Sequence, residues 1–277
     1  MKITADSSTL YNVAEGAEVG VGIVPLSITI GHENYREFEE ISRREFLKRI
    51  YEGAIPKSSL PSPGELLDMW DAHPDEDIIH IPMADGLSSS YKTAMGMKAT
   101  SPHSERITVI NSKTLCGPHR YIVKKAAEMA AQGLDRQVIL DAIHHKIANT
   151  ISFLIPSDFD YLRRGGRLNP LKARFASVLR LIPIMTQSAD GTQLETFATC
   201  RKFSDAIEIL KNQFADAVSK AECLISVSHA DNLKRAQAVV DTLSAVFPSA
   251  TFEILELGPA FITQGGPGCV AAQLVLM

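Results

Sequence analysis

The chain has 277 residues, of which 45% are hydrophobic and 22% charged, an ordinary globular composition with room for one large domain or two average ones. Its net charge of −4 argues against general nucleic-acid binding, which requires a basic face. No segment is apolar over the roughly 20 residues of a membrane span, and no long apolar run follows Met1–Asp6 as in a secretory signal. The four cysteines are far apart without a CxxC pair, which predicts buried thiols in a soluble cytoplasmic protein.

The first half of the chain alternates between predicted strands and helices. Strands are expected at residues 2–5, 19–30, 77–81 and 106–111, and helices at 43–51, 63–71, 87–99, 118–132 and 136–147. Pro25 cannot donate to a ladder, so the second strand is either an edge strand or broken there. Ser42 with Glu45, and Ser62 with Glu65, have the spacing of a capping box. The alternation predicts a parallel sheet covered on both faces, an α/β domain over residues 1–149.

The second half has a different pattern, which predicts an α+β domain with a mixed sheet over residues 150–277. Strands are expected at 150–155, 182–187, 193–199, 223–227, 251–257 and 270–276, and helices at 170–179, 204–218 and 233–247. Asp190-Gly191 between two of these strands is a hairpin signal.

Three consecutive hydroxyl residues, Ser88, Ser89 and Ser90, follow a predicted strand and open a predicted helix. Ligands of open parallel sheets bind beyond the carboxyl ends of the strands, where helix N-termini offer unpaired N–H groups. The pattern therefore predicts a seat for a carboxylate or phosphate, with a plain serine N-cap as the alternative. Ser58 and Ser59, which precede a helix that starts with proline, have the same pattern, and the two loops are expected to converge.

A second candidate is the arginine stretch from Phe159 to Leu168, which contains Arg163, Arg164 and Arg167 around a glycine pair. Gly165 is expected just after a short helix, where φ is often positive. The arginines are then either solvated charges on a capped turn or a fixed guanidinium patch for a phosphate or an acidic partner.

The run from Gln264 to Gly268 is rich in glycine and is expected to be a loop that brings backbone N–H groups close to a ligand. It matches neither a P-loop nor a dinucleotide-binding fingerprint, so the sequence gives no motif for nucleotide binding. A Gly-x-Ser-x-Gly elbow is also missing, so a serine hydrolase of the α/β type lacks its nucleophile signature.

Together these stretches resemble the DegV family, whose characterised members are bacterial fatty-acid-binding proteins. The similarity spans nearly the whole chain. The matching segments are Asp6-Ser7-Ser8, Val24-Pro25-Leu26, the runs 58–65 and 87–91, Tyr161–Leu168 continuing into Leu181–Ile184, Arg201, and Gly266-Pro267-Gly268.

The resemblance implies a two-domain α/β fold with one long-chain fatty acid, such as palmitate, stearate or oleate, buried between the domains. It implies that the carboxylate is held by hydroxyl and backbone groups of Ser58, Ser59, Ser88, Ser89, Ser90, Gln264, Gly265 and Gly266. It further implies no cofactor and no catalysis by the chain itself. Instead the acid is presented to a fatty acid kinase, which makes acyl-phosphate for phospholipid synthesis. The residues that dock the kinase would be Arg163, Arg164, Arg167 and Arg201.

The sequence departs from the family pattern at three positions. Ser58 replaces threonine, Leu60 replaces glutamine, and Gln264 replaces histidine before Gly-Pro-Gly. A glutamine amide can still donate to a carboxylate but carries no charge. One alternative function is a transferase or hydrolase acting at the Ser58 and Ser88 loops. Its hydroxyl nucleophile would need a base, and neither loop contains a histidine. Another alternative is a regulatory protein whose lipid is only structural.

Overall fold

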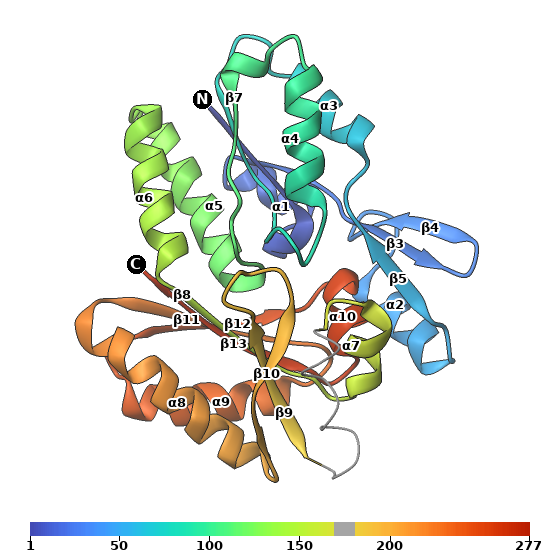
Figure 1. The fold of residues 1–277 in the computed structure, drawn as a ribbon, viewed down its shortest axis with the longest axis vertical. Helices are drawn as coiled ribbons and strands as arrows, with labels where there is room; N and C mark the ends of the chain where they lie inside the picture. Colours follow the sequence, from blue (N-terminus) through green and yellow to red (C-terminus); the bar gives the residue numbers. More distant parts are fainter. Residues whose placement is uncertain (169–180) are drawn as a thin grey trace. The chain divides into compact units, whose positions relative to one another are not determined.

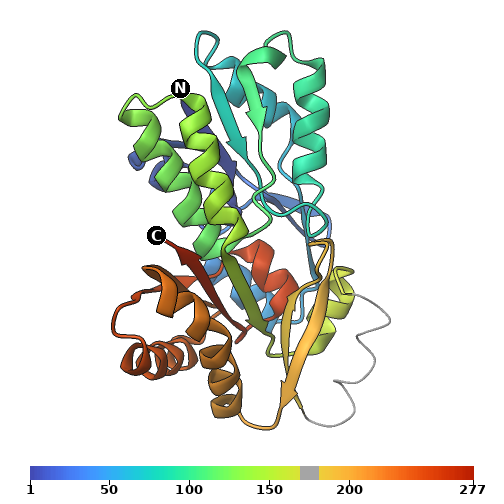
Figure 2. The ribbon, with the colours of Figure 1, turned by 60° about the vertical axis from the view of Figure 1, so that its left-hand side comes forward.

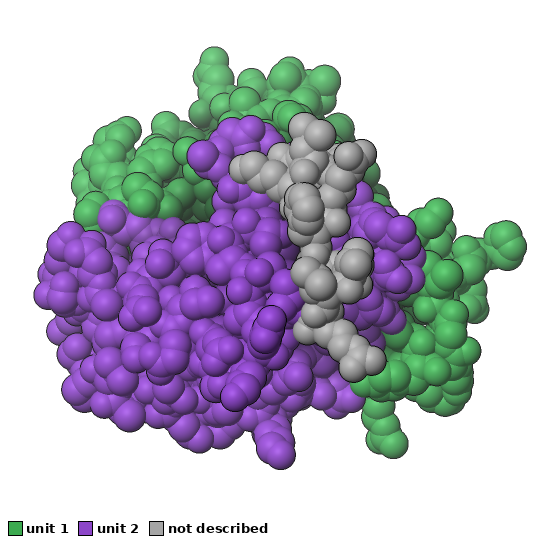
Figure 3. All heavy atoms as spheres, turned by 60° about the horizontal axis from the view of Figure 1, so that its bottom comes forward, with its two compact units in different colours: residues 1–148, 258–260 green, residues 149–257, 261–277 purple. Residues whose placement is uncertain are grey.

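The computed structural model describes residues 1–168 and 181–277, so the predicted helix at 170–179 lies outside the described residues. The chain divides into two compact units, which are coloured separately in Figure 3. Unit 1 comprises Met1–Ala148 with Gly258–Ala260, and unit 2 comprises Asn149–Leu257 with Phe261–Met277.

Unit 1 is built on a four-stranded parallel sheet with the order β2-β1-β6-β7 (Figure 1). The strands are β1 Lys2–Asp6, β2 Val21–Val24, β6 Ile78–Ile81 and β7 Ile107–Val109. Every residue of β6 is buried, as expected for a parallel strand covered on both faces. Helices α3 and α4 lie on one side of the sheet and α5 and α6 on the other (Figures 1 and 2). The prediction of an N-terminal α/β arrangement is confirmed.

The helices of unit 1 follow the apolar periodicity of the sequence. They are α1 Val13–Glu18, α2 Arg43–Tyr51, α3 Pro63–Asp71, α4 Ser90–Thr100, α5 Cys116–Ala131 and α6 Arg136–Ala148, with short 3-10 turns at Ser7–Thr9 and Ser104–Arg106. Leu66 and Trp70 of α3 pack with Ala94 of α4 on apolar residues of the sheet. Burying such side chains contributes about 1.5–3 kcal/mol each relative to exposure, which holds the helices on the strands.

A small antiparallel sheet in unit 1, with the order β4-β3-β5, is not predicted by the sequence. Its strands are β3 Ser27–Ile30, β4 Glu33–Arg36 and β5 Pro56–Ser59. The apolar run 19–30 is broken at Pro25 into β2 and β3, which confirms one of the two alternatives for that run. The prediction that Ser58 and Ser59 lie in a loop is wrong, because both are paired with β3 as part of β5.

The two predicted capping boxes of unit 1 differ in outcome. The N–H of Glu45 donates to Ser42 Oγ at 3.2 Å, as the pattern predicts for the start of α2. Within the described chain, Ser62 makes no side-chain cap bond at the start of α3, so the second prediction is wrong. The carboxylate of Glu65 instead pairs with Arg36 Nε at 2.7 Å. A hydrogen bond from a charged guanidinium to a carboxylate is stronger than one from a neutral backbone N–H.

Unit 2 is built on a mixed six-stranded sheet with the order β10-β9-β8-β13-β11-β12, as the sequence predicts for this half of the chain. The strands are β8 Thr150–Ile155, β9 Ile182–Gln187, β10 Leu194–Cys200, β11 Cys223–His229, β12 Thr251–Glu256 and β13 Val270–Leu276. The pair β11 and β12 is parallel, and β9 and β10 form the antiparallel hairpin predicted at Asp190-Gly191.

The main core of unit 2 lies between its sheet and two long helices, α8 Phe203–Lys220 and α9 Leu233–Val246 (Figure 1). Phe214 of α8 and Leu243 of α9 are fully buried against Ile225 of β11. Two short helices complete the unit, α7 Phe159–Gly165 and α10 Pro259–Gly265, the second of which begins in unit 1. The sequence does not predict α10, which places Gln264 and Gly265 at a helix end and not in a loop.

All four cysteines are buried, as predicted. Across residues 1–168 and 181–277, no helix combines the length and the apolar character that crossing a membrane requires.

Candidate functional site

The serine triplet lies where β6 leads into α4, at the carboxyl edge of the parallel sheet. Its three hydroxyls have different environments, because Ser90 is buried, Ser88 half-buried and Ser89 exposed. The Oγ atom of Ser88 accepts the N–H of Ser90 at 3.2 Å and lies 2.8 Å from Ser90 Oγ. The N-cap residue of α4 is Ser89, which makes no side-chain cap bond in the described chain, and Ser88 instead accepts the first N–H of the helix. Ser88 remains half-buried, so this contact and the predicted anion seat are compatible functions of one hydroxyl.

The second pair of predicted hydroxyls is divided by the pleat of β5. Successive side chains of a strand point to opposite faces. Ser58 shares its face with buried Pro56 and is half-buried, whereas Ser59 shares the other face with Lys57 and is exposed. Of this pair, Ser58 is therefore the hydroxyl that faces the inside of unit 1.

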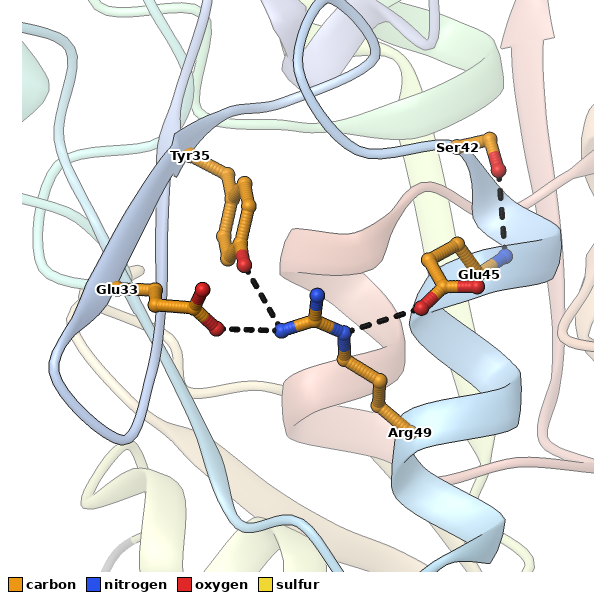
Figure 4. A network of polar contacts seen from close by, with 5 residues as sticks. All are labelled: Glu33, Tyr35, Ser42, Glu45 and Arg49. Carbon is orange, nitrogen blue, oxygen red and sulfur yellow. Dashed lines mark hydrogen bonds and ion pairs between the residues drawn. The ribbon is translucent and has the colours of Figure 1, made fainter.

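The small sheet that carries Ser58 is attached to α2 through Arg49 (Figure 4). The guanidinium donates to Glu33 Oε2 at 2.7 Å, to the Tyr35 hydroxyl at 2.8 Å and to Glu45 Oε1 at 3.1 Å. A hydrogen bond from the Tyr35 hydroxyl, together with Arg49, holds the pKa of Glu33 below its usual range. These contacts join β4 to α2 and add to the apolar burial of Ile28 and Ile30 in β3.

The loop between β6 and the serine triplet is anchored at consecutive backbone groups. The carbonyl oxygen of Ile81 lies 2.8 Å from His119 Nε2. The carbonyl oxygen of Pro82 accepts the N–H of Ser112 at 3.3 Å. The N–H of Met83 donates to Asp6 Oδ2 at 3.0 Å. The N–H groups of the next two residues donate to Thr114 O at 3.0 Å and to Asn111 Oδ1 at 3.1 Å. Ser88 N–H then donates to Ala84 O at 3.3 Å. The predicted seat would thus lie on a loop held by six backbone contacts, which favours precise placement of a ligand.

Two of the side chains that hold this loop, Asp6 and His119, form a buried trio with Ser8. None of the three residues has any exposed surface. Ser8 lies between the other two, with its Oγ in hydrogen-bond contact with Asp6 Oδ1 and 2.8 Å from His119 Nδ1. In a catalytic triad the imidazole lies between the acid and the serine, and its other nitrogen faces the acid. Here the second nitrogen is committed to the Ile81 carbonyl, so the trio is not arranged as a nucleophile.

His80 is the histidine nearest in sequence to Ser88 and is also buried. Its Nδ1 lies 3.0 Å from Thr4 Oγ1 on the neighbouring strand. Burial, and then the neighbouring His119, lower the pKa of His80 to about 3. A base works best with a pKa near the working pH, so His80 is poorly suited to activate a serine.

Glu37 forms a second buried acidic group beside Asp6. Its Oε2 accepts the Ser7 hydroxyl at 2.5 Å, and its Oε1 accepts the N–H of Ala260 at 2.8 Å. Burial raises the pKa of Glu37 to about 7, although both hydrogen bonds oppose the shift. Asp6 and Glu37 are each bound by a serine of the Asp6-Ser7-Ser8 segment, so this segment organises two buried carboxyl groups.

In unit 2 the arginine stretch packs on the end of α10. A Cβ atom on Gly165 would lie 1.8 Å from Gln264 Oε1, so that position of α7 admits only glycine while Gln264 keeps its place. A Cβ on Gly266 would lie 2.8 Å from the ring of Tyr161. The structure therefore brings together two segments that the sequence presented as separate candidates.

The C-terminal cap of α7 falls one residue later than predicted. Gly165 is the last residue of the helix, and Gly166 adopts the left-handed conformation with a φ of 70°. The two glycines of the pair thus have different roles. Gly165 permits close approach to Gln264, and Gly166 permits positive φ.

The four predicted docking arginines do not form one cluster. Arg163 is exposed and pairs with Asp160 at 3.1 Å, and the Arg164 guanidinium lies 4.5 Å from the centre of the Tyr161 ring. Arg167 is half-buried, and its carbonyl accepts Leu194 N–H at 2.8 Å at the start of β10. Arg201 follows the last residue of β10, on the order of 20 Å further along that strand at about 3.3 Å per residue.

Glu37 and His119 are two buried polar residues near the loop after β6 and the Asp6-Ser7-Ser8 segment that the sequence did not single out. The signal available for them was Asp6-Ser7-Ser8, a polar segment directly after a buried parallel strand. Side chains at that edge of a sheet lie near the loops of neighbouring strands. Their partners are distant in sequence, because 111 residues separate Ser8 from His119, so spacing alone did not identify them.

Comparison with known proteins gives matches over the whole chain. The family model described as "Uncharacterised protein, DegV family" matches residues 1–276. A DegV domain-containing protein of Halalkalibacterium halodurans is 29% identical, with 97% of this chain and 95% of that protein covered.

Two solved structures share the fold. DegV of Bacillus subtilis, described as a fatty acid binding protein, is 22% identical with a TM-score of 0.88, covering 100% of this chain and 99% of that one. A DegV family protein of Eubacterium eligens, loaded with heptadecanoic acid, is 21% identical with a TM-score of 0.85, and both chains are covered completely. The family model matches residues 1–276, and the two sheets and the Ser88 and Arg163 segments agree with that match. This chain therefore belongs to the DegV family.

Proposed function

We propose that this chain binds a long-chain fatty acid and that its own residues hold the acid without transforming it. The observation that carries the proposal is the full-length likeness to the Eubacterium eligens protein loaded with heptadecanoic acid. Family membership over residues 1–276 and the hydroxyl groups of Ser58 and Ser88 support it.

We propose that Ser88 and Ser58 are the main hydrogen-bond donors to the carboxylate. The remaining predicted groups contribute less. A carboxylate accepts hydrogen bonds, and a hydroxyl that faces a protected position can donate to it strongly. Ser88 and Ser58 are both half-buried, whereas Ser59 and Ser89 are exposed. Ser90, Gln264, Gly265 and Gly266 remain in the proposal as further donors or supports.

Protein purified from cells should carry one fatty acid for each chain. A tail buried among apolar side chains gains about 0.8 kcal/mol per methylene, so a long chain binds tightly enough to survive purification. Native mass spectrometry should give the mass of the complex, and organic extraction should identify the acid. A ligand-free mass, together with no uptake of added palmitate or oleate, would contradict the proposal.

We further propose that the bound acid is presented in the cytoplasm to the catalytic subunit of a fatty acid kinase, which phosphorylates the carboxylate for phospholipid synthesis. The support is the exposed guanidinium groups of α7 and the position of this helix against the end of α10. Arg163, Arg164, Arg167 and Arg201 are the proposed docking residues. Arginine is suited to acidic or phosphate-bearing surfaces because its donors form a rigid planar fork.

Reversing the charge of Arg163 and Arg164 to glutamate should leave the lipid content unchanged and lower acyl-phosphate formation at least about tenfold, because charges at the rim of an interface mainly set the association rate. The two side chains are exposed and Arg167 keeps its bonds, so the fold should persist. The measurement is the rate of acyl-phosphate formation with the catalytic subunit from the same organism.

The matched control is the double variant Lys220→Glu with Lys234→Glu. It changes the charge of unit 2 by the same amount through exposed residues of α8 and α9. Raising the salt concentration should weaken the wild-type reaction as well, because the screening length falls to roughly 3 Å at 1 M. Equal losses in the two double variants would show a general charge effect and remove α7 from the docking surface.

A further inference from the structure

The loop that carries Ser88 is held most firmly where it leaves β6, and the anchors there are side chains of unit 1 that lie far away in sequence. His119 reaches the carbonyl of Ile81, and Asp6 reaches the N–H of Met83. Both contacts are completely buried. From Met83 the loop returns to Ser88 through the bond between Ser88 N–H and Ala84 O.

The hydrogen atoms of the trio can be assigned from its contacts. A carbonyl only accepts, so His119 Nε2 carries a hydrogen toward Ile81 O. Asp6 receives the N–H of Met83 at 3.0 Å, the N–H of Ser8 at 3.1 Å and a contact from Ser8 Oγ.

Ser8 Oγ lies 2.8 Å from His119 Nδ1 and is in contact with Asp6 Oδ1, so the serine hydroxyl bridges the two side chains. Burial lowers the pKa of His119, and the charge of Asp6 and the hydrogen bond with the Ile81 carbonyl act against this shift. Asp6 and His119 are thus linked through Ser8, and each of them holds one backbone group of the loop.

We propose that Asp6 and His119 are positioning residues for the carboxylate seat: as a serine-bridged pair they hold Met83 N–H and Ile81 O, and so fix where Ser88 presents its hydroxyl. The inference rests on the proposed function. The pair does not touch the acid, because neither side chain has any exposed surface. It acts through the backbone of the loop that follows β6.

The test compares two substitutions at one position. Asparagine at position 119 places its amide near Nδ1, which keeps the contact with Ser8 and loses the one with Ile81 O. Glutamine reaches to Nε2 and keeps the donor to Ile81 O. We expect His119→Asn to lower the affinity for palmitate about tenfold and His119→Gln to stay near the wild type, the difference being one hydrogen bond.

The readout is the ratio of the affinities for palmitate and for hexadecanol, which share the same apolar tail. A variant that only weakens the fold lowers both affinities or neither. A variant that displaces Ser88 lowers the affinity for the acid and leaves that for the alcohol within about twofold, so the ratio falls. In the Ser88→Ala background His119→Asn should have little further effect on the ratio, because residues that act through one group are not additive.

The possible outcomes separate the inference from the proposed function. If Ser88→Ala lowers the ratio and His119→Asn does not, the seat stands and the positioning role is wrong. The same conclusion follows if His119→Asn and His119→Gln lower the ratio equally. If the wild type does not distinguish palmitate from hexadecanol, the carboxylate seat and the positioning role both fail.

A second variant covers the case in which His119→Asn does not fold. Asp6→Ala removes the acceptor of the Met83 N–H and leaves the contact between His119 and Ile81 O in place. It should lower the ratio of the two affinities and increase hydrogen exchange at the amides of residues 83–90. A wild-type ratio with unchanged exchange in folded Asp6→Ala would overturn the inference.

Discussion

The free energy of unfolding should differ between the wild type and Glu37→Gln by an amount that depends on pH. Between pH 5 and pH 8 this difference should change by about 2 to 3 kcal/mol. Glu37 is 1% exposed, and burial raises its pKa from an ordinary 4.5 to about 7. The negative charge of Asp6 acts in the same direction, whereas hydrogen bonds from Ser7 and Ala260 and the charge of Arg43 act against it.

The direction of the pH effect follows from where the proton is held. Between pH 4.5 and about 7 the folded chain keeps the Glu37 proton and the unfolded chain releases it. The folded state then binds more protons, so the free energy of unfolding decreases as the pH rises. The contribution is largest below the ordinary pKa and is lost once the pH passes the raised one. Glutamine resembles the protonated side chain and has no such dependence.

The measurement is denaturant unfolding of both proteins at several pH values, because the other titrating groups cancel in the difference. As the pH rises, the free energy of unfolding of Glu37→Gln should increase relative to that of the wild type. Glu52→Gln removes a carboxylate from an exposed position at the end of α2 and serves as the control. Parallel pH profiles for the wild type and Glu37→Gln would show that burial does not raise the pKa of Glu37.

Replacing Ser88 by alanine should weaken the binding of a long-chain fatty acid by about 10- to 150-fold. This corresponds to about 1.5–3 kcal/mol for a hydrogen bond to a charged group. Under the proposed function the Ser88 hydroxyl donates to the carboxylate. Its other contacts are the Ser90 N–H at 3.2 Å and the Ser90 hydroxyl at 2.8 Å. Loss of a serine cap costs about 1 kcal/mol of stability, so the fold should persist.

Ser88→Thr is the matched variant, because it keeps the hydroxyl and should retain most of the affinity. Titration with palmitate, alongside thermal unfolding, separates the loss of the donor from the loss of the cap. Wild-type affinity in a folded Ser88→Ala would mean that Ser88 is only a cap. The carboxylate would then have to lie elsewhere.

Elements with strong local signals were predicted from the sequence alone. Residues 150–155 and 182–187 were predicted as strands, and the structure has β8 and β9 at those positions. The helix from Arg43 to Tyr51 begins after Ser42, whose hydroxyl accepts the Glu45 N–H. Caps, turn residues and apolar periodicity act within a few residues, so they can be recognised without the fold.

The small sheet β4-β3-β5 could not be predicted in the same way. The sequence of β4 is Glu33–Arg36, which is polar and largely exposed, and β5 begins at Pro56. Neither has the apolar alternation of a half-buried strand. Both are strands because β3 lies between them and supplies the backbone partners.

For the candidate site, the sequence determined the residue types and the segments: hydroxyls after β6, arginines around a glycine pair, and glycines near the end of the chain. The tertiary structure decided which of these side chains are sheltered and which segments meet. The pleat of β5 separates Ser58 from Ser59, and Gly165 lies directly against the end of the Gln264 side chain. It also joined Ser8 to His119 across 111 residues. Such contacts depend on how strands and helices pack, and packing brings together residues that no spacing in the sequence relates.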